Sequence, residues 1–392
     1  AFIGLAVDRT PNLSKTESQD AYISITQHLL DDKSLKLNLA YDENKRKVEF
    51  LNDNGVYIPI LRSPERYYYE NRTLRKYTFY TSKEFKSDNN VFLIGGSIKI
   101  KDNDILEGYY KTPAARISIE DRLKFNRQSL YTIFTENQYN INEKNLFFLS
   151  LKYDHYHRDN GLKELDEYIA RIGWISYLQD NLYIKGFLTD AYVPPSFYEI
   201  EFSKDPKNLK SEDIKGGTIE LNYHRKEHKL RLFYGYSHLK DLIVFDKEGS
   251  YNPEKTFRSN LVMMEYEYAK KLDKKIYFSV YKNFINFNSF KLSPTFGWYV
   301  KYLQSKDKFD FFGELIYREG FTTLDGTKVS KSYNLNSGII YHYSQSFSIK
   351  LKGENLLNSS PKSVFPKIEN IVPTSIFSSY DRKILITIEK VF

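Results

Sequence analysis

Two arginines and three tyrosines gather in one short stretch of the chain, LRSPERYYYE, residues 61–70. A guanidinium group makes paired hydrogen bonds to anionic oxygens, and a phenol adds apolar contact area with a polar tip. The candidate ligand-binding residues in this long polar loop are therefore Arg62, Arg66, Tyr67, Tyr68 and Tyr69. They would suit an anionic chelate or a polar nutrient. The alternative is that the tyrosines form an aromatic girdle at a lipid headgroup level and the arginines meet lipopolysaccharide phosphates.

His155 and His157 stand two residues apart in YDHYHRD. In a strand this spacing places both imidazoles on one face, where they could reach a single metal ion or a haem. The alternative is a pair of ordinary surface histidines. With no third ligand nearby in the sequence, we predict no resident metal or cofactor and keep the two histidines as weak metal candidates.

Catalytic motifs are missing from the sequence. It has no cysteine, which excludes thiol chemistry and cysteine-ligated zinc. It has no G-x-S-x-G elbow, no H-E-x-x-H motif, and no carboxylate pair that stands out among its 50 acidic residues. We therefore expect a protein that is not an enzyme.

The net charge is +8 and the isoelectric point is about 9.0. A basic chain can bind nucleic acid, but these lysines are spread over turns, loops and polar strand faces, with no basic helix or phosphate-binding loop. Anionic lipopolysaccharide is the partner that this distribution favours.

Alternation of apolar and polar residues is the dominant pattern in the chain. Leu35, Leu37 and Leu39 share one parity, and Phe347, Ile349 and Leu351 repeat the pattern near the other end. This period of two predicts strands with one apolar face. No apolar run approaches the ~18 residues of a membrane-spanning helix. A mean hydropathy of −0.56 beside 16% aromatic residues fits a barrel whose strands are apolar on one face.

The connections between the expected strands alternate between short and long. Short polar turns are expected near 31–33, 86–90, 140–144, 179–181, 225–228, 270–274, 304–308 and 344–346, with longer segments between them. Outer-membrane barrels have short periplasmic turns and long extracellular loops, whereas a soluble β-sandwich, the alternative, has no reason to sort its loops by end. The sequence therefore predicts an all-β, antiparallel transmembrane β-barrel.

About eighteen strands are expected if residues 1–8 end a strand. The other seventeen lie near 20–30, 34–52, 71–86, 90–103, 128–139, 145–156, 166–178, 182–190, 214–224, 229–245, 257–269, 275–286, 294–303, 309–319, 331–343, 347–356 and 381–392.

Two prolines interrupt this pattern in the middle of the chain. Pro194 and Pro195 cannot donate to a strand ladder, so the preceding strand is expected to end near Asp190 and to release the chain into a long extracellular loop.

The same central stretch resembles a signature of TonB-dependent outer-membrane receptors. It has a Pro-Ser pair, a following glutamate, an Asn-Leu-Lys-x-Glu run, and two strands that end in Asp-Leu-Ile. Two further segments resemble the family in the same order, the hairpin that ends in Tyr153-Asp154 and the KLKGENLLN strand. The last strand resembles the signal that the barrel assembly machinery reads, with Lys390 as a departure from the expected apolar residue. The family-motif residues are Pro195, Glu199, Asn208, Leu209, Glu212, Asn355, Leu356 and Phe392.

The resemblance implies an outer-membrane receptor that takes up a scarce nutrient, with a ferric siderophore as the expected ligand and TonB as the energy source. Receptors of this family have a plug domain, an energy-coupling box and 22 strands, and neither plug nor box is found in residues 1–392. We therefore expect one barrel domain from a longer receptor whose plug domain lies outside this chain. The alternative is a complete, passive, porin-like channel of about eighteen strands.

Overall fold

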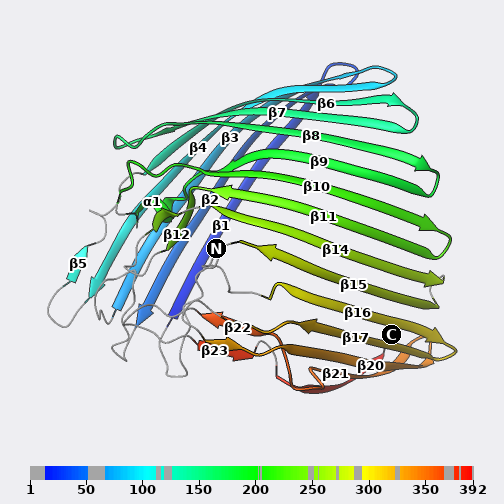
Figure 1. Ribbon diagram of the computed structural model, residues 1–392. Helices are drawn as coiled ribbons and strands as arrows, with labels where there is room; N and C mark the ends of the chain where they lie inside the picture. The colour runs from blue at the N-terminus through cyan, green and yellow to red at the C-terminus, as the bar shows by residue number, and fades with distance from the viewer. Residues whose placement is uncertain are drawn as a thin grey trace. The chain divides into compact units, whose positions relative to one another are not determined.

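The computed structural model describes residues 14–51, 67–111, 116–118, 126–201, 203, 205–245, 251–254, 256–270, 273–286, 294–322, 327–365, 375–378 and 381–390. Within these residues the chain is almost entirely antiparallel strand, and 18 strands belong to one large sheet (Figure 1). No described helix is long and apolar enough to cross a membrane.

The structure falls into two compact units, each described here by itself. Unit 1 comprises Ala1–Gly173, Thr189–Lys215 and Leu239–Thr256, and unit 2 comprises Trp174–Leu188, Gly216–His238 and Phe257–Phe392. The single barrel domain expected over residues 1–392 stays a prediction.

Unit 1 is built on a series of neighbouring antiparallel strands. The pairs run in the order β1, β2, β3, β4, β6 and β7, with the short β5 beside β4. The bounds are β1 Ser14–Leu29, β2 Leu35–Leu51, β3 Tyr67–Lys86, β4 Asn90–Lys111, β5 Arg116–Ser118, β6 Arg127–Asn142 and β7 Asn145–Arg158.

Unit 2 repeats the arrangement. Its pairs run in the order β14, β15, β16, β17, β20, β21 and β24. The bounds are β14 Phe257–Lys270, β15 Lys274–Ile285, β16 Phe296–Lys306, β17 Phe309–Arg318, β20 Ser332–Ser344, β21 Phe347–Glu354 and β24 Lys383–Lys390.

The remaining elements lie between these two series or in the connections. The strands that cross the division between the units are β8 Leu165–Gln179, β9 Leu182–Val193, β10 Glu212–Arg225 and β11 His228–Lys240. The connections contain α1 Phe197–Glu201, β12 Leu242–Phe245, β13 Tyr251–Glu254, β18 Phe321–Thr322, β19 Lys328–Val329, β22 Lys362–Phe365 and β23 Ser375–Ser378.

All seventeen strands expected after residues 1–8 are present, and the short turns join the predicted pairs of strands. One predicted strand is divided in two: the sequence predicts a continuous strand over residues 229–245, but β11 ends at Lys240. Asp241 has φ 53° there, and β12 pairs with β13 in a separate two-stranded sheet. Residues 1–8 lie outside the described residues.

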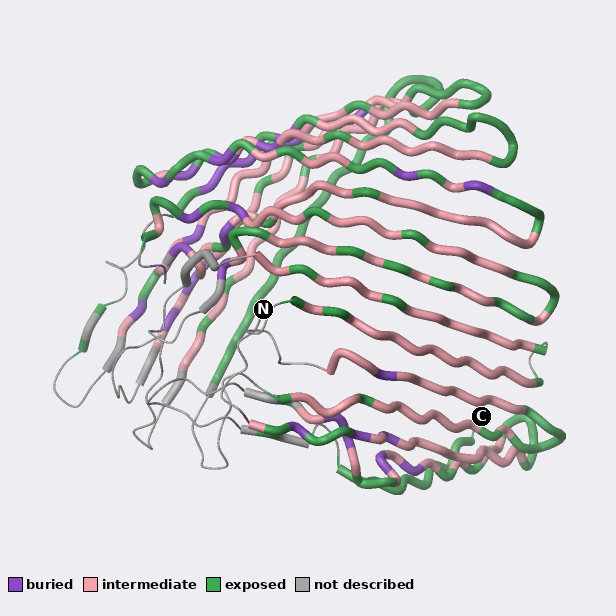
Figure 2. Tube along the Cα trace, in the orientation of Figure 1, coloured by how far each residue is buried: buried purple, intermediate pink, exposed green. Residues whose placement is uncertain are grey.

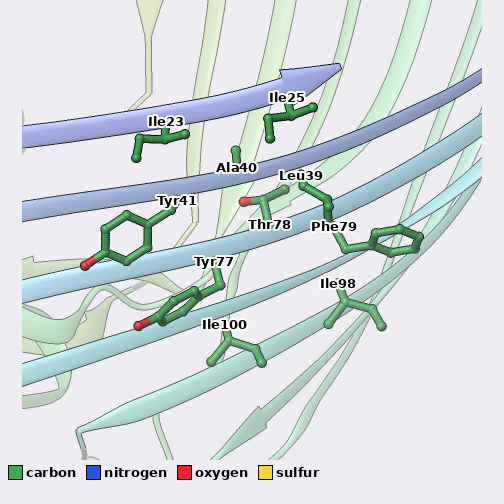
Figure 3. A pocket seen from close by; sticks show the side chains of 10 residues that line it. All are labelled: Ile23, Ile25, Leu39, Ala40, Tyr41, Tyr77, Thr78, Phe79, Ile98 and Ile100. Carbon is green, nitrogen blue, oxygen red and sulfur yellow. The ribbon is translucent and has the colours of Figure 1, made fainter. Parts of the chain in front are cut away.

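Apolar side chains cover one face of the sheet in unit 1. Leu39 stands opposite Ile25 of β1 and Phe79 of β3, and their side chains are 56%, 65% and 41% exposed. Figure 3 shows these residues on one side of the strands, with Ile98 of β4 continuing the row. Polar side chains point the other way, so the sheet has an apolar face and a polar face.

The same division holds in unit 2. Ile349 and Leu351 stand opposite Ile388 and Ile386 of the last strand, and all four are exposed. Large exposed apolar faces require a lipid or protein environment. The prediction that the apolar side chains of residues 35–39 and 347–351 share one exposed face with those of neighbouring strands is confirmed.

The two end strands differ from the rest in their exposure. The described side chains of β1 from Lys15 to Leu29 are all exposed, and so are those of β24 from Lys383 to Lys390 (Figure 2). The strands between them are mostly intermediate. Lys390 pairs with Phe347, and Phe392 lies outside the described residues.

Candidate functional site

The long connection after the two prolines is folded, and it begins with a capped helical turn. The Ser196 amide donates to a Glu199 carboxylate oxygen at 2.6 Å, and the Glu199 amide donates to Ser196 Oγ at 3.3 Å. This reciprocal pair satisfies two amide groups at the start of α1 that have no partner inside the helix. The Pro-Ser-x-x-Glu part of the family motif is therefore a helix cap.

Buried apolar side chains hold this connection in place. Ile200 and Leu209 are 0% and 1% exposed, and Ile200 packs with Leu162 and Phe197. Asn208 donates its side-chain amide to Asp205 at 2.6 Å, which closes the turn before Leu209. The prediction of a plain loop after Pro194 and Pro195 therefore describes only part of this segment, because the segment also has a small apolar core.

Glu212, the last glutamate of the motif, ties this connection to the next one. Its carboxylate accepts a hydrogen bond from the Ile243 amide at 2.7 Å, which joins β10 to β12 beside α1 (Figure 1). Burial raises the pKa of Glu212, and the bond from Ile243 opposes that shift.

Asp154 organises the polar face of β6, β7 and β9. It is 0% exposed, accepts hydrogen bonds from the hydroxyls of Thr132 and Tyr192, and pairs with Lys152 at 2.5 Å. The Tyr192 hydroxyl lies 3.0 Å from that of Tyr156, and the two rings meet edge to face. A buried carboxylate with three partners is a rigid structural element.

A second motif, around Asn355 in unit 2, also forms a turn. Asn355 has φ 47°, is 2% exposed, and its side-chain oxygen accepts the Ser359 amide at 3.0 Å. Its own amide donates to Asn336 at 2.8 Å. Leu356 lies against the backbone of Gly353, where a Cβ would approach Leu356 to 2.5 Å. The Asn-Leu pair therefore fixes the exit from β21.

A belt of ion pairs and hydrogen bonds crosses the polar face of unit 2. Arg231 donates to Glu220 and to Glu265, each at 2.9 Å, and the Tyr277 hydroxyl donates to Glu265 at 2.7 Å. Further along the face, Tyr299 and Asn336 both donate to Glu314, at 3.1 and 2.6 Å. These bonds link the side chains of neighbouring strands across the polar face.

The predicted ligand-binding residues of the first long connection are only partly described. Arg62 and Arg66 lie outside the described residues. The assignment of Tyr67, Tyr68 and Tyr69 to a loop is wrong, because they begin β3 and pair with Lys111, Tyr110 and Tyr109 of β4. A run of three tyrosines favours strand, which was the available signal.

His155 and His157 occupy the apolar-face side of β7, opposite Tyr131 and Ser129. Each has its own carboxylate: His155 lies 2.9 Å from Asp166 and His157 lies 2.7 Å from Glu164. Across the described residues, no three histidine, cysteine or acidic side chains are grouped as a metal site would require.

Sequence reasoning missed the buried polar residues, chiefly Asp154, Tyr192 and the pair Glu70 and Arg72. The last two are 2% and 3% exposed and form a 2.8 Å ion pair. The contacts of Asp154 join residues 22 and 38 positions apart, which no local pattern reveals. The helix cap could have been found, because Ser-x-x-Glu is a known start signal.

Comparison with known proteins gives a clear result at the level of the fold. No family model and no curated protein matches the sequence. Among solved structures, the ferric-catecholate import receptor Fiu of E. coli K12 (closed form) matches with a TM-score of 0.68 at 10% identity, over 97% of this chain and 65% of that one. The copper transporter OprC gives 0.73 at 11% identity over 97% and 65%. The siderophore receptor PirA of Acinetobacter baumannii gives 0.70 at 10% over 96% and 62%.

These similarities define the class of fold. The chain has the antiparallel β-barrel fold of TonB-dependent outer-membrane receptors, as the sequence resemblance predicted. It spans 62–65% of the length of these three solved proteins.

Proposed function

We propose that the chain is the β-barrel of an outer-membrane receptor that imports a scarce nutrient, with a ferric siderophore as its ligand and TonB as its energy source. The observation that carries this proposal is the shared fold, over almost the entire chain, with structures named as a ferric-catecholate import receptor and a siderophore receptor. The apolar face described above would meet outer-membrane lipid, and the basic residues would meet lipopolysaccharide.

The folded connection after β9 also supports a receptor. A passive pore has no need for a packed, capped segment among its outer loops, whereas a ligand-capturing surface needs loops held in fixed positions. The energised step would act through a plug domain. Transport of this kind uses no chemical conversion of the ligand, in keeping with a protein that is not an enzyme.

Uptake measurements test the proposal. The complete gene would be expressed in a Gram-negative strain that lacks its own siderophore receptors, and entry of radiolabelled ferric chelates would be followed with and without functional TonB. We expect saturable uptake that disappears when TonB is removed. Uptake that is unsaturable and unchanged by loss of TonB would contradict the receptor proposal and favour a porin-like channel.

A further inference from the structure

An unneutralised group of basic side chains lies on the polar face of unit 1. In one row of the sheet, Lys76 of β3 stands opposite Lys101 of β4, Lys101 opposite Gln128 of β6, and Gln128 opposite Arg158 of β7. Lys99 is two residues before Lys101 and so shares its face. Adjacent strands are about 4.8 Å apart, so these residues border one continuous patch.

The lysines at the centre of this patch have no anionic partner. Lys76 is bound by Asp42 at 2.7 Å, but neither Lys99 nor Lys101 takes part in any hydrogen bond or ion pair of the described structure. Both are partly buried, and the charges of Lys76 and Lys99 repel that of Lys101. Unpaired cations held this close together favour a bound anion.

Two buried polar side chains beside the lysines are also unsatisfied. Asn103 is 0% exposed, and neither its amide nitrogen nor its oxygen has a hydrogen-bond partner. Arg158 is 2% exposed; Nε and Nη2 donate to the Lys163 carbonyl, whereas Nη1 has no partner. A buried donor without a partner costs about 1–3 kcal/mol, so a ligand that accepts these bonds would be held firmly.

The carboxylates near the patch do not cancel its charge. Asp154 is already bound by Lys152, and Asp42 by Lys76. Glu167 interacts electrostatically with Arg158 and is the remaining acidic neighbour that the described contacts place there. Lys99, Lys101 and Arg158 together therefore exceed the local negative charge.

We propose that Lys99, Lys101, Asn103 and Arg158 form a binding site for an anionic, oxygen-rich ligand. This inference rests on the proposed function and narrows its ligand to a negatively charged ferric chelate with catecholate or carboxylate oxygens. A neutral hydroxamate chelate would leave the cationic patch uncompensated. An acidic protein segment at the same place is the competing occupant.

Binding to purified protein tests the site directly. The full-length receptor in detergent would be titrated with trianionic iron(III) tris-catecholate and, separately, with a neutral iron(III) tris-hydroxamate, following quenching of protein fluorescence. Lys99→Gln with Lys101→Gln should weaken catecholate binding about 100-fold, because each lost charged hydrogen bond corresponds to roughly tenfold. Lys350→Gln, on the polar face of unit 2, is the matched control and should bind as the parent does.

Arg158→Gln provides a second variant, and we expect a loss of about tenfold. Unaltered heat-dependent migration on gels would show that each variant is folded. Tighter binding of the hydroxamate by the parent protein, or full catecholate affinity in the double variant, would overturn the site. Lower stability of the ligand-free double variant with full catecholate affinity would also overturn it, and would identify a protein segment as the occupant.

The outcomes separate this inference from the proposed function. Lysine-dependent catecholate binding in a protein that supports no TonB-dependent uptake would leave the site standing and refute the receptor. TonB-dependent uptake of a neutral chelate, unaffected by the two lysine substitutions, would do the reverse.

Discussion

At the scale of single residues, several motif positions that suggested a ligand site turn out to shape the backbone. Ser196 and Glu199 cap a helical turn, Asn355 adopts a left-handed conformation that few residue types tolerate, and Glu212 holds the Ile243 amide. The unsatisfied groups that carry the proposed ligand site, Asn103 and Arg158, lie elsewhere, on the polar face of unit 1. Motif resemblance and ligand contact are therefore separate properties of this chain.

Glu212 gives a prediction at this scale. Burial raises the pKa of Glu212 in the folded state, so the folded state binds this proton more tightly than the unfolded state does. Glu212 therefore contributes more to stability below about pH 4.5, where it is neutral, than at pH 7, where it is ionised. Glu212→Gln keeps an acceptor for the Ile243 amide without a charge, so we expect equal or slower hydrogen exchange at that amide at pH 7. Glu212→Ala leaves the amide unpartnered and should speed its exchange, at a cost of about 1–3 kcal/mol. Equal exchange in the two variants would show that the bond has no role.

At the scale of strands, the apolar face and the polar face of the sheet tolerate different substitutions. Leu37 shares the apolar face with Leu39, whereas Lys36 lies on the polar face with its ammonium over the Tyr80 ring. A lysine near the middle of a lipid-facing strand costs roughly 2–4 kcal/mol. We expect Leu37→Lys to reduce the amount of assembled protein in the outer membrane and Lys36→Leu to leave it unchanged, as measured by heat-modifiable gel migration. Normal assembly of Leu37→Lys would argue against lipid contact at this face.

The belt in unit 2 gives a second prediction for the strands. Arg231 lies between Glu220 and Glu265, so replacing it with methionine leaves two carboxylates facing each other. We expect Arg231→Met to lower the free energy of unfolding by about 1–3 kcal/mol. Lys229→Met, which removes a single and more exposed ion pair to Glu267, should change it by less than about 1 kcal/mol. Urea unfolding in detergent, followed by tryptophan fluorescence, measures both, and equal effects would show that the belt is not cooperative.

The strands also show how far sequence reasoning reaches. Alternation and turn chemistry are local, so the seventeen strands, their faces and the sorting of their connections were all predictable. The partners of Asp154 and the row from Lys76 to Arg158 depend on which residues of adjacent strands stand opposite each other. The alternation of apolar and polar residues does not define that register. The tyrosines at 67–69 were assigned to a long loop, but they pair with β4, and that pairing could not be seen in the local sequence.

At the scale of the molecule, the exposed end strands predict how the chain behaves when produced alone. A strand with an unpaired edge is a template for pairing with another chain. We expect the 392-residue polypeptide, refolded in detergent, to form dimers and larger species by light scattering. Thr26→Lys in β1 and Thr387→Lys in β24, which add charge on the polar face of the end strands, should shift these species toward monomer. A monodisperse monomer from the parent chain would contradict the prediction.

The nearest-neighbour order of the strands has a consequence for how the number of strands in such a barrel could change during evolution. The short turns join strands that also pair with each other, as β16 and β17 do through residues 307–308. Duplicating or deleting one complete hairpin would therefore keep every remaining turn on its original side and preserve the sense of every remaining strand. Because the width of a barrel grows with strand number, such an event would alter the diameter of the lumen in one step. A complete hairpin is thus the smallest segment whose gain or loss leaves the direction of all other strands unchanged.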